Sequence, residues 1–410
     1  MQTINTQYRK RTQRLDVVLN INHLTYKIPG IFSWLILTAA LTGIFLYPYV
    51  VLQGARMLAY YMLVRFLVVV IFYVTGLVRM NLAEKRVKTK VYVLSPHELE
   101  VAQKVHHVVI IPNYKEPVEI LSRTLAGLAC QENAVEKITV VLAMEKADPT
   151  AEEKDAILRQ QFEGQFAHIL TTYHPPRLPG EIPGKGSNET WAARAARREL
   201  VDELHMDLND LTITSCDADS IFHPAYFAEL TRQFATDPSR YRRFWQGPLV
   251  FDNNITEVNP IIRILTFFQN TIQISELANF VNLRMPLSTY SLSYRLADEV
   301  GYWDPAVIAE DWHMFLRCYF AKRGRIRLKP IFLKTTGDAI VGDNLVQTLS
   351  NYYQQQFRHA WGATDIGYIL QQWERTPSMP TRKKLISLVK VLHDNMLLSS
   401  IGFVVTLGSL

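Results

Sequence analysis

Apolar residues are concentrated at the two ends of the chain, while the middle alternates short apolar runs with polar segments. Residues 28–52 carry no charge and residues 57–78 carry only Arg65. A helix needs about 20 apolar residues to cross a bilayer, so each run predicts a transmembrane helix. The short segment 53–56 between them predicts a tight hairpin. The alternative is a buried helical hairpin in a soluble core.

Basic residues flank this predicted transmembrane hairpin, residues 28–79, on both sides. Because cytoplasmic flanks of membrane helices are rich in lysine and arginine, we expect both flanks, including the N-terminal segment 1–27, to be cytosolic. An integral protein of the plasma or inner membrane with a cytosolic catalytic middle follows. The flanking residues are Arg9, Lys10, Arg11, Arg14 and Lys27 before the hairpin and Arg79, Lys85, Arg86, Lys88 and Lys90 after it.

The other end of the chain predicts contact with the membrane as well. Residues 383–393 alternate lysine with apolar residues, as in a helix that lies at a membrane interface. Residues 396–410 are wholly apolar but too few to span a bilayer. We therefore expect interfacial helices over residues 337–393 and the start of a further transmembrane helix over residues 394–410.

Residues 104–336 predict an α/β domain with a mostly parallel sheet, because short β-branched runs alternate with helical periods. In open α/β sheets ligands bind beyond the carboxyl ends of the strands, so the polar residues that end each strand are the first candidates for chemistry. The predicted strands begin at His107, Ile138, Ala167, Leu211, Phe244 and Arg325, and the predicted helices include residues 118–131, 152–166 and 189–206.

Composition excludes several classes of protein. The three cysteines, Cys130, Cys216 and Cys318, are far apart and predict neither a disulfide framework nor a zinc site. The formal charge of +6 on 410 residues is modest, and no basic segment is interleaved with aromatic residues. We therefore expect no nucleic-acid partner, and we assign the excess charge to membrane lipids.

Asp217 and Asp219 directly follow the predicted strand that begins at Leu211. Side chains two apart in an extended segment point to the same face, so the two carboxylates can share a ligand. Mg²⁺ and Mn²⁺ prefer one or two carboxylates together with phosphate oxygens. The pair therefore predicts a divalent metal site, and the alternative is an acidic turn without function.

Two further segments carry candidate chemistry. Lys185 lies between Gly184 and Gly186, where an ammonium and backbone amides can approach a phosphate, although such a loop is also common on solvated surfaces. Glu310 and Asp311 precede an amphipathic helix. They are either an acidic N-capping pair or a general base for transfer to a hydroxyl.

Five motifs in this order resemble family 2 glycosyltransferases of the processive, membrane-bound kind, the group that includes cellulose, chitin and hyaluronan synthases. The motifs are IPNYKEP, Asp217-Ala218-Asp219, STYSLSYRLADEVGYWDP, Ala309-Glu310-Asp311 and QQQFRHAWG. The resemblance covers residues 104–362 and implies a GT-A-like, Rossmann-related fold with transmembrane helices at both ends.

The resemblance implies a role for each matching residue. It assigns Glu116, Glu145 and Asp148 to the nucleotide, and Asp217 and Asp219 to a donor diphosphate held through Mg²⁺ or Mn²⁺. Asp311, with Glu310 beside it, is the implied catalytic base. Gln355 and Arg358 are implied to contact the diphosphate or the acceptor channel. Lys185 is expected, from its glycine-flanked position, to face the same diphosphate.

Three positions depart from the family pattern. His359 stands where the family has tryptophan, with Trp361 two residues later, so the acceptor-stacking platform differs. Ala309 replaces threonine, and Glu145 replaces aspartate, which keeps the carboxylate on a longer arm.

The implied activity is inverting transfer of a sugar from a nucleotide-sugar donor, expected to be a UDP-sugar, to a glycan or lipid-linked acceptor at the cytosolic membrane face. One alternative is a transferase that adds a single sugar to a polyprenyl phosphate. Another is a non-catalytic membrane scaffold with the same fold, against which the intact Asp217, Asp219 and Asp311 argue.

Overall fold

The computed structural model describes residues 23–89 and 93–397, and the chain divides into two compact units. The first, here the hairpin unit, contains the described residues up to 68, residues 179–181, and the described residues from 357 on. The second, here the sheet unit, contains residues 69–178 and 182–356. The predicted basic segment before the hairpin and most of the predicted segment 394–410 lie outside the described residues.

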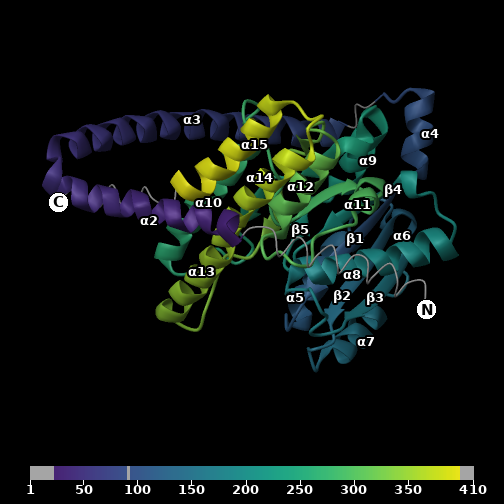
Figure 1. Ribbon diagram of the computed structural model, residues 1–410. Coiled ribbons are helices and arrows are strands. Elements are labelled where there is room, and N and C mark those ends of the chain that lie inside the picture. Colours follow the sequence, from purple (N-terminus) through teal and green to yellow (C-terminus); the bar gives the residue numbers. More distant parts are fainter. Residues whose placement is uncertain (1–22, 90–92, 398–410) are drawn as a thin grey trace. The chain divides into compact units, whose positions relative to one another are not determined.

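A seven-stranded sheet of order β3-β2-β1-β4-β8-β6-β9 forms the centre of the sheet unit (Figure 1). Every neighbouring pair is parallel except those that β8 makes with β4 and β6. The predicted α/β domain with a mostly parallel sheet is confirmed. The strands are β1 (His106–Asn113), β2 (Ile138–Glu145), β3 (His168–His174), β4 (Leu211–Ser215), β6 (Arg243–Gln246), β8 (Tyr290–Ser293) and β9 (Arg327–Pro330).

The central strands are buried because their sequences are nearly continuous apolar runs, as expected of parallel strands covered on both faces. Val108 to Ile111 in β1 and Val140 to Met144 in β2 are inaccessible to solvent. The register aligns Asn113 with Met144, so β1 and β2 end at the same edge of the sheet. The polar segments that follow these strands therefore begin close together.

Helices cover the sheet, and α8 packs across β1, β2 and β3. Several begin where local sequence favours a helix start. For example, Asn259 caps α10 by accepting a hydrogen bond from the Ile261 amide (3.0 Å), and Pro260 fills the first position. The helical segments are α4 (Pro96–Lys104), α5 (Val118–Ala129), α6 (Ala134–Lys137), α7 (Ala151–Gln161), α8 (Lys185–Arg197), η1 (Arg198–Glu203), η2 (Leu208–Asp210), α9 (Tyr226–Thr236), η3 (Arg240–Arg242), α10 (Pro260–Ala278), α11 (Tyr294–Val300) and α12 (Glu310–Ala321).

A second, three-stranded sheet was not predicted. It has the order β5-β10-β7, with β5 (Ile221–Phe222), β7 (Leu249–Phe251) and β10 (Thr335–Gly337). The predicted single strand from Phe244 is wrong, because β6 belongs to the large sheet and β7 to the small one. Gly247 and Pro248 separate them: a Cβ on Gly247 would lie 2.5 Å from the Leu333 carbonyl oxygen, and proline lacks the amide that a central strand needs.

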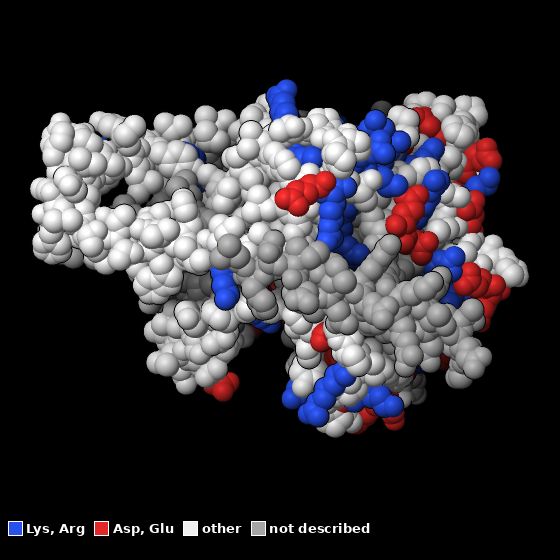
Figure 2. Space-filling view, viewed as in Figure 1, with Lys and Arg blue, Asp and Glu red and all other residues white. Residues whose placement is uncertain are grey.

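Two apolar helices precede the sheet, α2 (His23–Leu46) and α3 (Pro48–Thr89). Both are long and apolar enough to cross a membrane, and few of their residues are buried. That exposure argues against the buried-core alternative. The hairpin turns at Tyr47, and the expected turn at residues 53–56 is wrong. Pro48 disfavours helix in the residue before it and fits the first turn of a new helix, whereas residues 53–56 continue α3. Around this turn the surface is nearly free of charge (Figure 2).

The C-terminal part of the described chain is helical. It comprises α13 (Leu345–Ala360), η4 (Trp361–Thr364), α14 (Asp365–Arg375), α15 (Thr381–Leu392) and η5 (His393–Leu397). Within the hairpin unit, α14 packs against α2 and α15. The predicted helix over residues 383–393 corresponds to α15 and the start of η5.

Candidate active site

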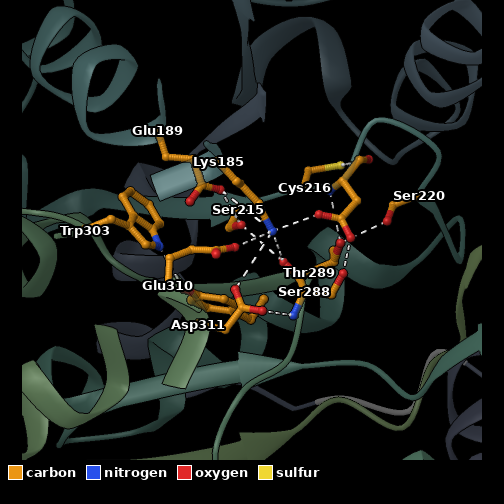
Figure 3. Close-up of polar contacts among 12 residues, drawn as sticks. Lys185, Glu189, Ser215, Cys216, Ser220, Ser288, Thr289, Trp303, Glu310 and Asp311 are labelled. Atoms are coloured by element: carbon orange, nitrogen blue, oxygen red, sulfur yellow. Dashed lines mark hydrogen bonds and ion pairs between the residues drawn. The ribbon is translucent and has the colours of Figure 1, made fainter. Parts of the chain in front are cut away.

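Acidic and basic side chains converge at the carboxyl edge of β1 and β4, inside the sheet unit (Figure 3). Asp217 follows β4, Lys185 opens α8, and Glu310 and Asp311 open α12. Helix N-termini favour negative charge because their backbone amides are unpaired. The residue at the N-cap of α12 is Ala309, and the acidic pair lies in the first turn of the helix, where it also interacts favourably with the helix N-terminus.

The Lys185 ammonium is surrounded by four carboxylates, here the Lys185 cluster. Its Nζ lies 2.7 Å from Asp217 Oδ1, 3.5 Å from Glu310 Oε1, 3.8 Å from Asp311 Oδ1 and 4.0 Å from Glu189 Oε1. Gly186 makes the close approach of α8 and α12 possible, because a Cβ there would lie 3.1 Å from the Glu310 Cβ. One cation therefore faces more negative charge than it can balance.

Burial and this charge imbalance shift the pKa values of the cluster away from their ordinary values. Burial raises the pKa of Glu189 to about 8, raises that of Asp311, and raises that of Glu310 well above its usual range. Burial alone would lower the pKa of Lys185, but the surrounding carboxylates, Asp217 first, hold it well above its ordinary value. The crowded carboxylates therefore favour the uptake of a proton or of a further cation.

Ser288 connects the members of the cluster through both its backbone and its side chain. Its amide donates to Asp311 Oδ2 (2.6 Å), its carbonyl accepts from Lys185 Nζ (2.6 Å), and its hydroxyl donates to Asp217. Its φ of 59° lies in the left-handed region, which is unfavourable for a residue with a Cβ. Such strain is typical of functional sites, where surrounding contacts maintain it.

The second oxygen of Asp311 has no hydrogen-bond partner among the described residues unless Glu310 is protonated. Oδ1 is buried, the Lys185 ammonium lies 3.8 Å away, and a protonated Glu310 carboxyl can donate to Asp311. Buried carboxylate oxygens are normally hydrogen-bonded, so an unpaired one requires an explanation. A hydroxyl-bearing ligand would supply the missing donor.

Asp219 is held in place by the segment that follows β10. Its Oδ2 accepts the amide of Asp338 (2.8 Å), whose own carboxylate accepts from Arg123 (2.6 and 2.7 Å) and Asn253 (2.9 Å). Burial first, and then the charge of Asp217, raises the pKa of Asp219 to about 6. The two predicted metal ligands therefore repel each other, and a cation would relieve that repulsion.

The donor set fits a divalent metal of the magnesium type. Among the described residues no group of three or more histidine, cysteine or acidic side chains is arranged to hold a metal ion. Mg²⁺ and Mn²⁺ sites of enzymes that act on phosphates commonly use only one or two carboxylates, with the substrate supplying the rest. Asp217 and Asp219 offer such a pair beside an excess of negative charge.

Three other predicted residues lie at the ends of β1 and β2, and within the described part of the chain no contact joins them to the Lys185 cluster. Burial raises the pKa of Glu116, whose carboxylate accepts the Tyr114 amide. Glu145 lies 3.1 Å from His174 Nδ1.

Asp148 is committed to internal contacts. Its carboxylate accepts from the Lys115 amide (3.0 Å) and Lys154 Nζ (2.6 Å), which joins the loops that follow β1 and β2. Burial alone would raise the pKa of Asp148, but these contacts hold it well below its usual range. Asp148 therefore shapes the edge beside Glu116.

Gln355 and Arg358 keep their expected spacing on α13. Gln355 belongs to the sheet unit, and its Oε1 is buried without a hydrogen-bond partner among the described residues. Arg358 belongs to the hairpin unit and is exposed, as are His359 and Trp361. The predicted diphosphate role of Gln355 and Arg358 stays a prediction.

Sequence reasoning missed three residues that complete the site. Glu189 lies one helical turn after Lys185, so its position on the same helix face was available as a signal. Ser288 begins the quoted motif STYSLSYRLADEVGYWDP, whereas Asp338 offered no signal. The role of neither residue could be predicted, because it depends on a backbone conformation and on contacts between distant segments.

Comparison with known proteins points to one class of enzyme. Residues 212–410 match the sequence profile of the family described as "Glycosyl transferase family group 2". The match includes Asp217, Asp219 and Asp311 and begins after Lys185. No curated protein matches the chain in sequence.

Several solved structures are similar to the chain. The mannosyltransferase PcManGT from Pyrobaculum calidifontis, in complex with GDP-Man and Mn2+, is 12% identical, with a TM-score of 0.48 over 84% of this chain and 85% of that one. Residues 1–349 of S. aureus TarS, in complex with UDP-GlcNAc, are 12% identical, with a TM-score of 0.43 over 71% and 73% of the two chains. Glucosyl-3-phosphoglycerate synthase from Mycobacterium tuberculosis, in complex with uridine diphosphate, is 14% identical, with a TM-score of 0.39 over 70% and 86%.

Proposed function

We propose that the chain is a glycosyltransferase that moves a sugar from a nucleotide-sugar donor to a hydroxyl of a glycan or lipid-linked acceptor. The observation that carries the proposal is the Lys185 cluster, in which Lys185, Asp217 and Asp311 meet from three distant segments. The family match over residues 212–410 supports it, because that region contains both aspartates.

The donor diphosphate binds in this proposal at Asp217, Asp219 and Lys185. A divalent cation, when bound by the two aspartates, neutralises negative charge that develops on the leaving diphosphate. Lys185 is already oriented by the Ser288 carbonyl and Asp217, so its ammonium needs little reorganisation to face a phosphate oxygen.

Asp311 is the general base for the acceptor. The acceptor oxygen forms a bond to the anomeric carbon as the bond from that carbon to the diphosphate oxygen breaks, and the hydroxyl proton passes to Asp311. The nucleoside diphosphate leaves, and a single displacement of this kind inverts the anomeric centre. The unpaired Oδ1 supports the role, since the Ser288 amide already occupies Oδ2.

Glu116 and Glu145, at the ends of β1 and β2, contact the nucleoside in this proposal, and the donor is a UDP-sugar. Asp148 acts there by holding the two loops together. Its internal contacts support a positioning role more than direct contact with the nucleoside.

The proposed site works at the cytosolic face of a membrane. Besides the α2–α3 hairpin, α10 carries an outward apolar face formed by Ile261, Ile264, Phe268 and Ile272, each about half exposed. Within the sheet unit, the Phe72 ring of α3 meets the Phe280 ring that follows α10 (5.5 Å). An exposed apolar face on a helix that lies near the apolar part of α3 fits a membrane interface.

The direct test incubates the full chain, reconstituted in membranes with Mg²⁺ or Mn²⁺, with a panel of nucleotide sugars and membrane-derived acceptors. Release of nucleoside diphosphate together with a larger product is expected for one donor. Product size distinguishes polymer extension from addition of one sugar to a polyprenyl phosphate. Absence of transfer and of donor binding across the panel would favour the scaffold.

Topology is tested with thiol labelling in intact cells. Cys130 is exposed in the sheet unit, and a Tyr47→Cys variant places a thiol at the hairpin turn. A membrane-impermeant thiol reagent should label the introduced cysteine and leave Cys130 unlabelled until the cells are opened. Labelling of Cys130 in intact cells would put the site away from nucleotide sugars and contradict the proposal.

A further inference from the structure

Arg65 interrupts the apolar part of α3 in the hairpin unit. Its neighbours Leu63, Val64, Phe66 and Leu67 all have exposed side chains, as expected of a helix that faces lipid. An arginine stays charged in such surroundings, and desolvation of that charge is costly. Its position therefore requires a specific partner.

The partner comes from the distant C-terminal helices. Arg65 Nη1 lies 2.7 Å from His393 Nε2, which the Tyr61 hydroxyl also contacts. His393 Nδ1 lies 2.6 Å from Asp394 Oδ1, and Lys390 Nζ lies 2.8 Å from Asp394 Oδ2. We call these residues the Arg65 network.

This network leaves the guanidinium charge unbalanced. Asp394 is the carboxylate of the network, and its two oxygens are engaged by His393 and Lys390. No carboxylate oxygen of the described residues lies within 4.0 Å of Arg65, and its Nε and Nη2 make no hydrogen bond to them. A guanidinium offers five N–H donors in a planar fork that matches a phosphate or carboxylate. Arg65 therefore presents unused donors and an unbalanced positive charge.

The level of Arg65 along the helix points to the source of an anion. Counted from the turn at Tyr47, Arg65 lies as far along α3 as Pro29 lies along α2, because the two residues are equally distant from Tyr47 in sequence. Pro29 is close to Lys27, where the apolar stretch of α2 begins. Helices have the same rise per residue, so Arg65 lies level with the start of the apolar stretch of α2, although residues 66–78 of α3 are apolar as well. The long arginine side chain can extend from there to the level of the lipid phosphates.

We propose that Arg65, oriented by His393, binds the phosphate headgroup of a membrane lipid. The lipid chains would extend along the exposed apolar surface of α3, and the phosphate would supply the negative charge that the described residues do not. This site is separate from the Lys185 cluster, and the proposal does not depend on glycosyl transfer.

The test measures binding to the purified full chain in detergent by native mass spectrometry. The probes are phosphatidic acid, diacylglycerol with the same acyl chains, and inorganic phosphate. Phosphatidic acid should bind, diacylglycerol should not, and inorganic phosphate should bind at least about a hundredfold more weakly because it lacks the chains. Equal binding of phosphatidic acid and diacylglycerol, or tight binding of phosphate alone, would overturn the proposal.

Matched variants assign the binding to the network. Arg65→Gln should weaken binding of phosphatidic acid about tenfold or more, the usual loss for a hydrogen bond to a charged group. Arg56→Gln removes the same charge from an exposed position on the same helix and should change binding less than about twofold. Equal effects of the two variants would mean that the network only joins helices.

A third variant remains informative if Arg65→Gln does not fold. Asp394→Asn removes the negative charge of the Arg65 network, which repels an anion bound at Arg65. A lipid-phosphate site should then bind phosphatidic acid about two- to fivefold more tightly. Unchanged or weaker binding would contradict the proposal, because a purely structural network predicts a loss of stability and no gain in affinity.

Discussion

Replacement of Asp311 by asparagine separates a catalytic base from a structural carboxylate. The asparagine oxygen can still accept the Ser288 amide, which lies 2.6 Å from Oδ2. The amide nitrogen then occupies the place of Oδ1, 3.8 Å from the Lys185 ammonium. A donor thus replaces the acceptor that would receive the acceptor hydroxyl's proton, while the shape of the site is kept.

The expected loss in turnover follows from the role of Oδ1. A positioned general base contributes about 10²- to 10⁴-fold, or about 2.7–5.4 kcal/mol of transition-state stabilisation. Donor binding should change little, because the proposed diphosphate contacts are made by Asp217, Asp219 and Lys185.

Stability should move in the opposite direction. Burial, and then repulsion by Asp217, raise the pKa of Asp311, so the wild-type protein loses stability as the pH rises through the folded-state pKa. Asparagine removes this pH-dependent loss of stability and also removes one carboxylate of the Lys185 cluster. The free energy of unfolding at neutral pH should therefore stay the same or rise.

The assay combines nucleoside diphosphate release in the presence of acceptor, donor binding by calorimetry, and urea unfolding. Glu310→Gln is the matched control: it removes the neighbouring carboxyl in the same helix turn, leaves Asp311 in place, and should keep turnover within about tenfold. The reasoning is refuted if Asp311→Asn keeps more than about a tenth of wild-type turnover, or if it loses activity only through unfolding.

Three further predictions concern other parts of the sheet unit. Ser288→Ala should destabilise the fold by about 1.5–3 kcal/mol through the lost hydrogen bond to Asp217, and Ser288→Gly by about 1 kcal/mol less, because glycine tolerates the left-handed backbone. If urea unfolding shows the same loss in free energy of unfolding for both variants, the backbone at residue 288 is not strained. Asp219→Ala should weaken Mn²⁺-dependent donor binding at least about tenfold, and an unchanged response to Mn²⁺ and chelator would remove it from the metal site. Burial lowers the pKa of His106 from 6.5 to about 4, so the unfolded state binds more protons between these values and stability should fall as the pH drops through that window. His106→Asn should flatten this dependence of stability on pH in urea titrations, and an unaltered dependence would assign it to other groups.

The local pattern of apolar and polar residues was enough to predict elements that are stabilised by neighbours in sequence or by one buried face. The strands β1 to β4 were predictable because their apolar runs are bounded by polar segments. Asp217 and Asp219 were predictable candidates because they end such a run. Helix starts were less certain: α8 begins at Lys185, four residues before the predicted start.

Contacts between distant segments decided the rest. Strand β8 enters the sheet antiparallel between β4 and β6, and no local pattern in residues 288–305 specifies that pairing. It brings Ser288 between Asp217 and Asp311, in a backbone conformation that its sequence does not favour. Asp338 reaches Asp219 only because β10 pairs with β5 and β7.

The sequence therefore indicates which residues can do chemistry more clearly than it indicates how they are assembled. Carboxylates at strand ends and helix starts can be predicted from each segment's own sequence, since their local geometry depends on neighbours in sequence. The charge imbalance around Lys185 cannot, because it exists only once two helix N-termini and a strand end meet within 4.0 Å. Strand order and burial set those distances, and with them the shifted pKa values of the Lys185 cluster.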